Sequence, residues 1–378
     1  MRIGVVLMNL GGPTREENVQ DFLYNLFSDE DIIKMGGGKM QNLFAGIISK
    51  FRAPHVAEDY KRINGCPKGC TGNRHCVNRR DRVVSDCCSP INGLTERQRR
   101  ALERQLKGRL SDADLSDVDV KVYTCMRYWL PFADTIMDDM VADGITHTVL
   151  LPLYPQFSWT TTGSSFRDWE SVRKKKFGDR IPWKEFHIKN YHRNPDYISA
   201  INDRIDAALS GLDDETRRKT HFIFSAHGTP MLEVRSGDPY TIEIEETIEA
   251  VMAARPEKNS YWVSYQSRVG PQKWTQPNTA ELVRRHLDYG IRNFLMIPIA
   301  FVTDHIETLY ELEVEMLEDL EEEGRSVDNY VVMEGLNQHE LFIKALADET
   351  LGRLKHEISP AGGGPDGAGQ ETEKVSID

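Results

Sequence analysis

The sequence lacks the features that mark membrane-spanning and secreted proteins. None of its apolar runs approaches the ~18–20 residues that a membrane-spanning helix needs, and cysteine contributes only six of 378 residues. The N-terminal residues 1–13 are basic and then apolar, but they contain no small-residue cleavage site and run directly into a glycine turn. This favours a first strand over a signal peptide and predicts a cytoplasmic protein.

The chain also has fewer basic than acidic side chains. Lysine and arginine number 47 against 59 aspartates and glutamates, which gives a formal net charge of −12. An acidic chain disfavours broad nucleic-acid binding, so we expect no nucleic-acid partner. The length is sufficient to bury a sizeable core and to form two lobes.

Short apolar runs alternate with amphipathic stretches along the chain. This order predicts parallel sheets with helices on both faces. The pattern starts at Ile3 and again near Thr220, and each first strand ends in a glycine-bearing turn. We therefore predict an α/β fold of two doubly wound, Rossmann-like lobes, related by internal pseudo-symmetry, with a cleft between them. The expected strands are 3–9, 118–125, 146–152, 220–226, 260–265, 294–300 and 329–333, and the expected helices include 96–110, 134–143, 196–210, 240–254 and 278–289.

The expected domains follow from this pattern. Residues 1–155 form the N-terminal lobe with a cysteine-rich insert at 66–88. Residues 156–356 form the C-terminal lobe, whose last helix is free to pack back on the first lobe. Residues 357–378 are rich in glycine and acidic side chains with almost nothing to bury, so we expect this tail to be disordered.

An acidic stretch follows the apolar run FLMIPIAFV. Asp304, Glu307, Glu311, Glu315 and Glu318 succeed one another at steps of three, four, four and three. On a helix this spacing places the carboxylates on one stripe, where they repel one another. The stripe is either a solvated face or a site for a cation. Its position after a buried strand favours the site, because open α/β sheets bind ligands at the carboxyl ends of their strands.

Two glycine turns also follow predicted strands. Asn9-Leu10-Gly11-Gly12-Pro13 lacks the spacing of a phosphate-binding loop, which favours close approach of the backbone to a flat ligand. His227 lies in Ser-Ala-His-Gly-Thr-Pro. It is suited to accept a proton near neutral pH, the alternative being a structural histidine bonded to a loop carbonyl.

Several segments in order resemble the ferrochelatase family over residues 1–356. They are LMNLGGPTREENVQDFLYNLFSDEDII, MRYWLPF, LPLYPQFSWTTTGSSF, FSAHGTP, GDPY, YQSRVGPQKWTQP and IPIAFVTDHIETLYELEVE. The resemblance implies a lyase that inserts Fe2+ into protoporphyrin IX, with release of two protons, to give protohaem. Coproporphyrin III as substrate, cobalt insertion into a corrin precursor, and a non-catalytic iron–sulfur or zinc sensor are the alternatives.

The resemblance also implies roles for single residues. His227 matches the active-site histidine, which we assign as base and metal ligand, and Glu307 matches its partner carboxylate. We expect these two side chains to meet across the gap between the lobes. Glu311 and Glu315 would relay ions or protons. The expected porphyrin-binding residues are Leu10, Arg52, Tyr60, Ser89, Arg127, Tyr128, Tyr154, Trp274, Phe301 and His305.

Five of the six cysteines lie between residues 66 and 88. Such crowding in a cytosolic enzyme argues for a metal rather than disulfides. The segment resembles ferrochelatases that carry an internal 2Fe–2S cluster, which implies that four of the five thiolates hold the cluster, with zinc as the alternative. The sixth, Cys125, is expected to be a buried small hydrophobe. The candidate ligands are Cys66, Cys70, Cys76, Cys87 and Cys88.

Residues 42–54, NLFAGIISKFRAP, combine apolar side chains with basic ones. The segment either rests on the inner membrane surface as a peripheral contact or packs on the core. The protein is expected to be a monomer or a homodimer.

Overall fold

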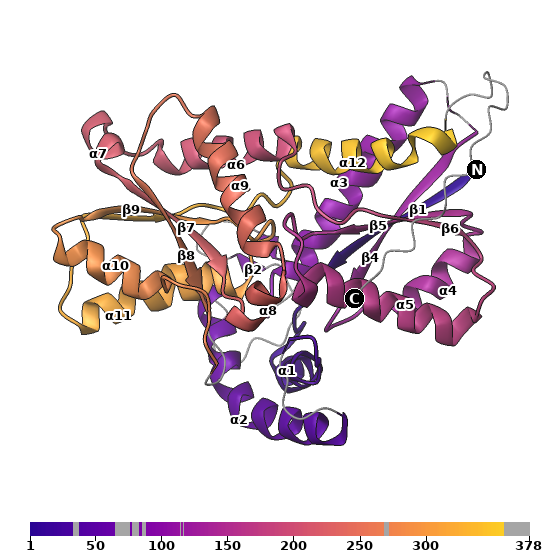
Figure 1. Ribbon diagram of the computed structural model, residues 1–378, viewed down its shortest axis with the longest axis horizontal. Coiled ribbons are helices and arrows are strands. Elements are labelled where there is room, and N and C mark those ends of the chain that lie inside the picture. Colours follow the sequence, from indigo (N-terminus) through magenta and orange to yellow (C-terminus); the bar gives the residue numbers. More distant parts are fainter. Residues whose placement is uncertain are drawn as a thin grey trace.

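The computed structural model describes residues 1–32, 38–64, 76–77, 83–84, 88–113, 115, 117–267 and 272–358. Two four-stranded sheets lie side by side with helices on both faces (Figure 1). The expected tail lies outside the described residues, apart from its first two positions.

The first sheet has the order β4-β1-β5-β6, and all of its strands are parallel. Side chains of β1 alternate between its two faces because successive residues of a strand point in opposite directions. Val5 and Leu7 join the core under α3 and α12, whereas Val6 and Met8 join the core under α4 and α5. The strands are β1 (Arg2–Asn9), β4 (Asp119–Met126), β5 (His147–Pro152) and β6 (Lys184–His187). The helices are α3 (Ile91–Asp112), α4 (Ala133–Ala142), α5 (Ser164–Phe177) and α12 (Glu340–Ile358), and α5 follows a short π-helix, η2 (Trp159–Gly163).

The second sheet has the order β10-β9-β7-β8 and is also parallel. Phe222 and Phe224 of β7 pack toward α6 and α9, and Ile223 packs toward α10 and α11. The strands are β7 (His221–His227), β8 (Tyr261–Gln266), β9 (Asn293–Pro298) and β10 (Asn329–Val332). The helices are α6 (Pro195–Leu209), α7 (Asp214–Lys219), α8 (Met231–Ser236), α9 (Tyr240–Ala254), α10 (Thr279–Asp288), the π-helix η3 (Glu307–Glu315) and α11 (Met316–Glu322).

One hydrophobic core runs through both sheets. Helix α12 packs against α3 on the first sheet and against α6 on the second. Arg109 of α3 pairs with Asp348 of α12, and Lys344 of α12 pairs with Asp196 of α6 at 2.6 Å. The last helix therefore joins the two halves of the molecule.

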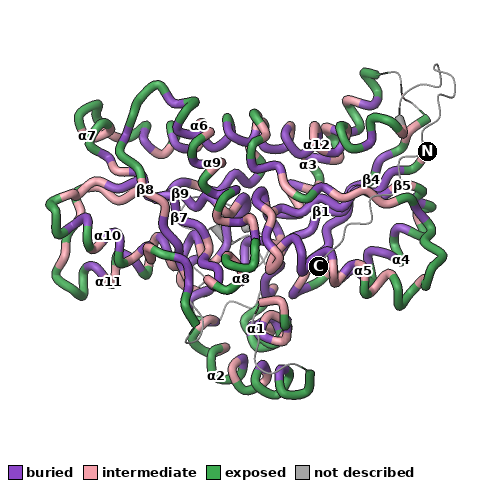
Figure 2. Tube along the Cα trace, viewed as in Figure 1, coloured by how far each residue is buried: buried purple, intermediate pink, exposed green. Residues whose placement is uncertain are grey.

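A helical arm projects from the sheets, as Figure 2 shows. It contains η1 (Glu16–Asn18), α1 (Val19–Phe27) and α2 (Gly38–Asn64). The end of α2 packs on η3, where Tyr60 lies in one apolar cluster with Leu309 and Tyr310. Arg62 of α2 also bonds to the Tyr310 hydroxyl at 3.2 Å. The arm thereby connects the N-terminal residues to the acidic helix.

The seven expected strands are all present, and the expected α/β fold with two parallel sheets is confirmed. Strand β6 was missed because it is short, and only Phe186 of its four residues is apolar. It pairs with β5, so the first sheet includes residues on both sides of the division expected after residue 155. Asp304 does not lie on the acidic stripe, since the helix begins at Glu307 and Asp304 is buried in the loop before it.

Candidate functional site

His227 lies at the carboxyl end of β7. Its Nδ1–H donates to the Gly228 carbonyl at 2.6 Å, which leaves Nε2 of the neutral ring with its lone pair. The turn requires glycine, because a Cβ at position 228 would lie only 2.7 Å from the Ser267 carbonyl oxygen. The Tyr240 hydroxyl donates to the His227 carbonyl at 3.1 Å. The histidine thus has the bond to a loop carbonyl that a structural role requires, and it also keeps one nitrogen available for chemistry.

Glu307 is the first residue of η3, and it follows a loop that leaves β9. Among the residues described, its Oε2 atom is buried without a hydrogen-bond partner, and the nearest basic atom, His305 Nε2, is 3.7 Å away. A buried carboxylate oxygen without a partner is costly unless a cation or a proton occupies the place beside it. The site therefore favours a cation or a proton beside Glu307 Oε2.

The imidazole of His227 and the carboxylate of Glu307 interact. Burial alone would raise the pKa of Glu307, but His227 and His305 outweigh it and hold this pKa below its ordinary value. The Phe301 ring neighbours both histidines, with its centroid 6.5 Å from that of His227 and 4.7 Å from that of His305. Both functional side chains belong to the second sheet, so the expectation that they come from opposite lobes was wrong.

Further glutamates continue from Glu307 toward the surface. Glu311 accepts from the Ser267 hydroxyl at 2.7 Å and from Gln266 Nε2 at 3.4 Å. Burial, and then the charge of Glu307, raise the pKa of Glu311 to about 8. Glu315 is exposed, and partial burial together with Asp319 and Asp59 raises its pKa as well. Glu307, Glu311 and Glu315 are spaced four residues apart, so the π-helical turns place them on one side of η3, in a row from the interior to solvent.

Glu311 predicts a pH dependence of stability. Its folded-state pKa lies above the value of the unfolded chain, so the folded protein binds the extra proton between about pH 5 and pH 8. Stability is therefore lost as pH rises through this window. Glu311→Gln, which is neutral throughout, should abolish most of that loss, on the order of a few kcal/mol. Urea unfolding at pH 5, 7 and 9 measures it, and equal pH slopes for the two proteins would contradict the assignment.

A second group of side chains lies at the carboxyl ends of β4 and β5. Arg127 Nη2, the Tyr128 hydroxyl and the Ser164 hydroxyl all donate to Asp29 Oδ2, at 2.9, 2.5 and 2.7 Å. Burial alone would lower the pKa of the Arg127 guanidinium, but Tyr128 and Asp29 raise it. Sequence reasoning missed Asp29. Its only sequence signal is an acid after a helix, and its partners are about a hundred residues away.

Three tyrosines interact electrostatically with Glu307. The charge of Glu307 contributes to raising the pKa of Tyr60, Tyr154 and Tyr240, although burial is the main cause in each. Tyr60 comes from α2, Tyr154 follows β5, and Tyr240 begins α9. The residues near Glu307 therefore come from both sheets and from the helical arm.

The other predicted porphyrin-binding residues are distributed as follows. Leu10 lies in the apolar cluster of Tyr60 and Tyr128, and buried Ser89 bonds to Tyr60. Trp274 packs over the glycine turn at 228. Arg52 is exposed, and its guanidinium lies over the Phe27 ring at 5.7 Å. Apart from Arg52, these side chains are buried or half-buried around the same region.

The cysteine segment lies mostly beyond what the structure describes. Cys66, Cys70 and Cys87 are outside the described residues, and only the backbone of Cys76 is described. Cys88 is buried in the cluster of Tyr60 and Tyr128. Among the residues described, no three His, Cys, Asp or Glu side chains are arranged to hold a metal ion. Cys125 is buried, as expected, and burial raises the pKa of its thiol.

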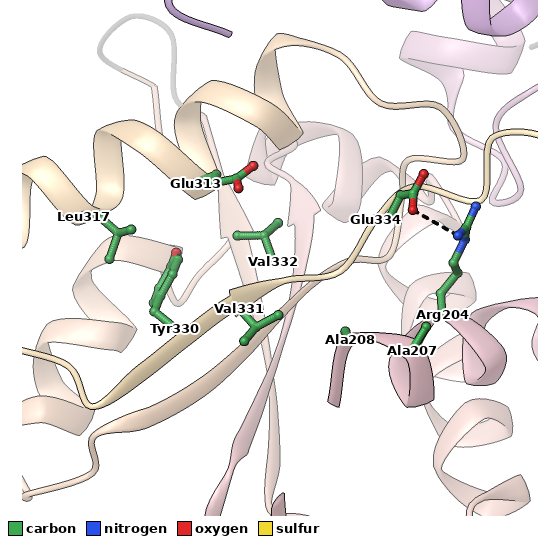
Figure 3. A pocket seen from close by; sticks show the side chains of 9 residues that line it. All are labelled: Arg204, Ala207, Ala208, Glu313, Leu317, Tyr330, Val331, Val332 and Glu334. Atoms are coloured by element: carbon green, nitrogen blue, oxygen red, sulfur yellow. Dashed lines mark hydrogen bonds and ion pairs between the residues drawn. The ribbon is translucent and has the colours of Figure 1, made fainter. Parts of the chain in front are cut away.

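A separate pocket of about 380 Å³ lies on the outer side of η3 (Figure 3). Glu313 and Leu317 face it from one side, and Ala207 and Ala208 of α6 from the other. Of the predicted site residues that the structure describes, none lines it. Helix η3 therefore has two faces, one with Glu307 and Glu311 toward the histidines and one with Glu313 toward this pocket.

Comparison with known proteins gives a consistent family. A sequence model described as Ferrochelatase matches residues 2–70 and 77–353. A ferrochelatase from Gloeobacter violaceus is 36% identical over 357 residues, covering 93% of this chain and 98% of that protein. One from Picosynechococcus sp. is 39% identical over 349 residues, covering 92% and 81%.

Among solved structures, a multi-domain Deinococcus radiodurans protein described as similar to chelatases has a TM-score of 0.44 and 10% identity, covering 93% of this chain and 54% of that one. In the part of the chain that the structure describes, no helix is long and apolar enough to cross a membrane.

Proposed function

Because this chain belongs to the ferrochelatase family, lyases that insert iron into a porphyrin for haem biosynthesis, we propose that His227 and Glu307 carry the insertion. We further propose that the porphyrin is protoporphyrin IX. The observation that carries the assignment is the buried, unpartnered Glu307 Oε2 beside two histidines. A hydrated ferrous ion would satisfy this oxygen, and moderate oxygen and imidazole ligands would release it again to the ring.

The chemistry requires the porphyrin to lose two pyrrole protons as two bonds from nitrogen to iron replace two N–H bonds. His227 Nε2 has the lone pair to accept one proton at a time, because Nδ1 is committed to Gly228. Glu307 balances the imidazolium that forms. Glu311, with its pKa of about 8, holds a proton near neutral pH and gives it up readily. Glu315 would deliver it to solvent.

Anaerobic assays test this function. The protein is mixed with Fe2+ and either protoporphyrin IX or coproporphyrin III while the absorption bands of the ring are followed. Apolar Leu10, among Tyr60 and Tyr128, suits the less charged protoporphyrin, so we expect faster insertion into protoporphyrin. A preference for coproporphyrin would favour the second candidate function, and failure with both rings would overturn the proposal.

We also propose that the cysteine segment holds a 2Fe–2S cluster, with four of its five cysteines as ligands. The described backbone supports a folded segment, because β2 (Cys76–Val77) and β3 (Val83–Val84) pair antiparallel. Cys76 lies opposite Val84 in this pair of strands.

The colour of the protein tests the cluster. Protein purified without added metal should be reddish-brown, show visible sulfur-to-iron absorption, and contain about two irons and two sulfides per chain. Cys76→Ala should lose the colour, whereas Cys125→Ala, which alters a buried thiol outside the segment, should keep it. Colourless protein with stoichiometric zinc would show the alternative to be right.

We propose that the arm rests on a membrane surface, with the enzyme itself cytoplasmic. Helix α2 exposes Met40, Leu43, Phe44, Ile47 and Phe51, which recur at helical spacing, and Phe51 is 79% exposed. Exposed Lys50 and Arg52 neighbour them. Apolar side chains bordered by basic ones favour an anionic bilayer.

Flotation with anionic liposomes checks this surface. Phe44→Glu/Phe51→Glu should reduce the membrane-bound fraction at least about tenfold, because two charges would enter the bilayer surface. Tyr289→Glu, at a side chain that is 80% exposed directly after α10, should float like the original protein. Equal flotation of all three proteins would mean that α2 does not bind lipid.

A further inference from the structure

A buried polar network surrounds the loop that carries His305 toward Glu307. Its members are no more than 4% exposed: Gln98, Thr303, Asp304, Thr308 and Asn337. Polar side chains in such a place are costly unless each is hydrogen-bonded. The network must therefore do more than fill space in the core.

Gln98 enters this network from the first sheet. It lies on α3, whose Leu102 and Leu106 pack under β1. Gln98 Nε2 donates to the Asn337 carbonyl at 2.9 Å and lies 3.1 Å from the Thr303 hydroxyl, which donates to Gln98 Oε1 at 3.2 Å. One amide from the first half of the molecule thus holds two segments of the second.

Asn337 connects Gln98 to the loop through hydrogen bonds. Its backbone N–H donates to the Val302 carbonyl at 2.8 Å, its Oδ1 accepts from Asp304 N at 3.1 Å, and its Nδ2 donates to Asp304 Oδ2 at 2.8 Å. Its φ is +47°, a left-handed conformation that asparagine adopts more readily than most residues. Three consecutive loop residues, Val302, Thr303 and Asp304, are therefore each hydrogen-bonded to Asn337 or to Gln98.

The loop in turn orients the histidine beside Glu307. His305 Nδ1–H donates to the Thr303 carbonyl at 2.9 Å, and its backbone N–H donates to the Thr308 hydroxyl at 3.1 Å. The opposite ring nitrogen faces Glu307 at 3.7 Å. A shift of Thr303 would consequently move the His305 ring and the start of η3 together.

We propose that Gln98 is a positioning residue for His305 and Glu307, acting through Thr303 and Asn337. This inference rests on the proposed function of Glu307 in iron insertion. Gln98 is fully buried within the network, so its role is to hold the acidic site of the second sheet against the first sheet. Small misplacements of reacting groups, on the order of 1 Å, cost up to about 100-fold in rate.

Gln98→Leu tests the proposal, with Gln105→Leu on the same helix as the matched control. Gln98→Leu should lower kcat at least about tenfold while KM for the porphyrin changes less than about twofold. Gln105→Leu should change neither. A purely structural role would lower the melting temperature and leave the kcat of the folded protein unchanged, and that outcome overturns the proposal.

Thr303→Val provides a second variant in case Gln98→Leu does not fold, since it removes the bond between Thr303 and Gln98 with little change in volume and leaves the bond from Gln98 to Asn337. It should show the same fall in kcat. Amide hydrogen exchange at Asp304 and His305 gives a readout that needs no activity, and Gln98→Leu should speed it at least about tenfold. If the original protein inserted no iron but Gln98→Leu exchanged faster, the positioning role would stand and the proposed function would be rejected. If Gln98→Leu changed neither the exchange nor kcat, the positioning role alone would be rejected.

Discussion

Replacing His227 by alanine should lower the rate of iron insertion by about 100-fold or more, and Glu307→Gln should have an effect of similar size. Positioned acid–base groups contribute about 10²–10⁴-fold to catalysis. His227 supplies the free Nε2, and Glu307 supplies the unpartnered oxygen beside it. The two changes should be much less than additive, because Glu307 acts on the same imidazole and iron. Steady-state rates of the single and double variants measure this.

Glu313→Gln is the control for Glu307→Gln. It changes the same residue type on the same helix, but its side chain faces the outer pocket in Figure 3. Glu313→Gln should keep at least about half of the rate of iron insertion. The loss in Glu307→Gln would then reflect the position of that carboxylate and not the net charge of η3. Near-normal rates for both His227→Ala and Glu307→Gln would refute the assigned site.

Asp304→Ala should destabilise the fold by about 3 kcal/mol or more. Asp304 is 1% exposed, and its carboxylate accepts from Gly335 N, the Thr308 hydroxyl and Asn337 Nδ2, at 3.1, 3.1 and 2.8 Å. Alanine would remove the acceptor of the Gly335 N–H, and it would leave Thr308 and Asn337 with only the His305 carbonyl and Glu334 as acceptors, at about 1–3 kcal/mol for each bond lost. Position 335 adds to the constraint, since a Cβ there would lie 3.0 Å from Asp304 N. Urea unfolding at neutral pH measures the loss.

Asp319→Ala is the matched control for Asp304→Ala. Asp319 pairs with Arg284 at 3.0 Å, but its side chain is 48% exposed. Exposed ion pairs contribute about 0–1 kcal/mol, so this change should be nearly neutral. If the two variants unfolded at the same urea concentration, the network around Asp304 would not stabilise the loop.

Short apolar runs that alternate with amphipathic stretches were sufficient to predict the two parallel sheets. The apolar runs of β1, β7 and β9 are buried on both faces, and such runs signal a parallel strand without knowledge of its neighbours. Strand β6 gave no such signal. Lys184 is exposed and the three residues that follow are half-buried, so only its pairing with β5 makes it a strand.

The sequence by itself determined the order of strands and helices, the glycine turn that exposes one nitrogen of His227, and the spacing of Glu307, Glu311 and Glu315. These are local properties, fixed by residues a few positions apart. Only the tertiary structure decided that His227 and Glu307 share one sheet, that Asp29 holds Arg127 and Tyr128, and that Gln98 and Asn337 brace the loop before η3. Each of those roles depends on partners between 33 and 239 residues apart in the sequence, and an interaction over such a separation leaves no periodicity in the chain.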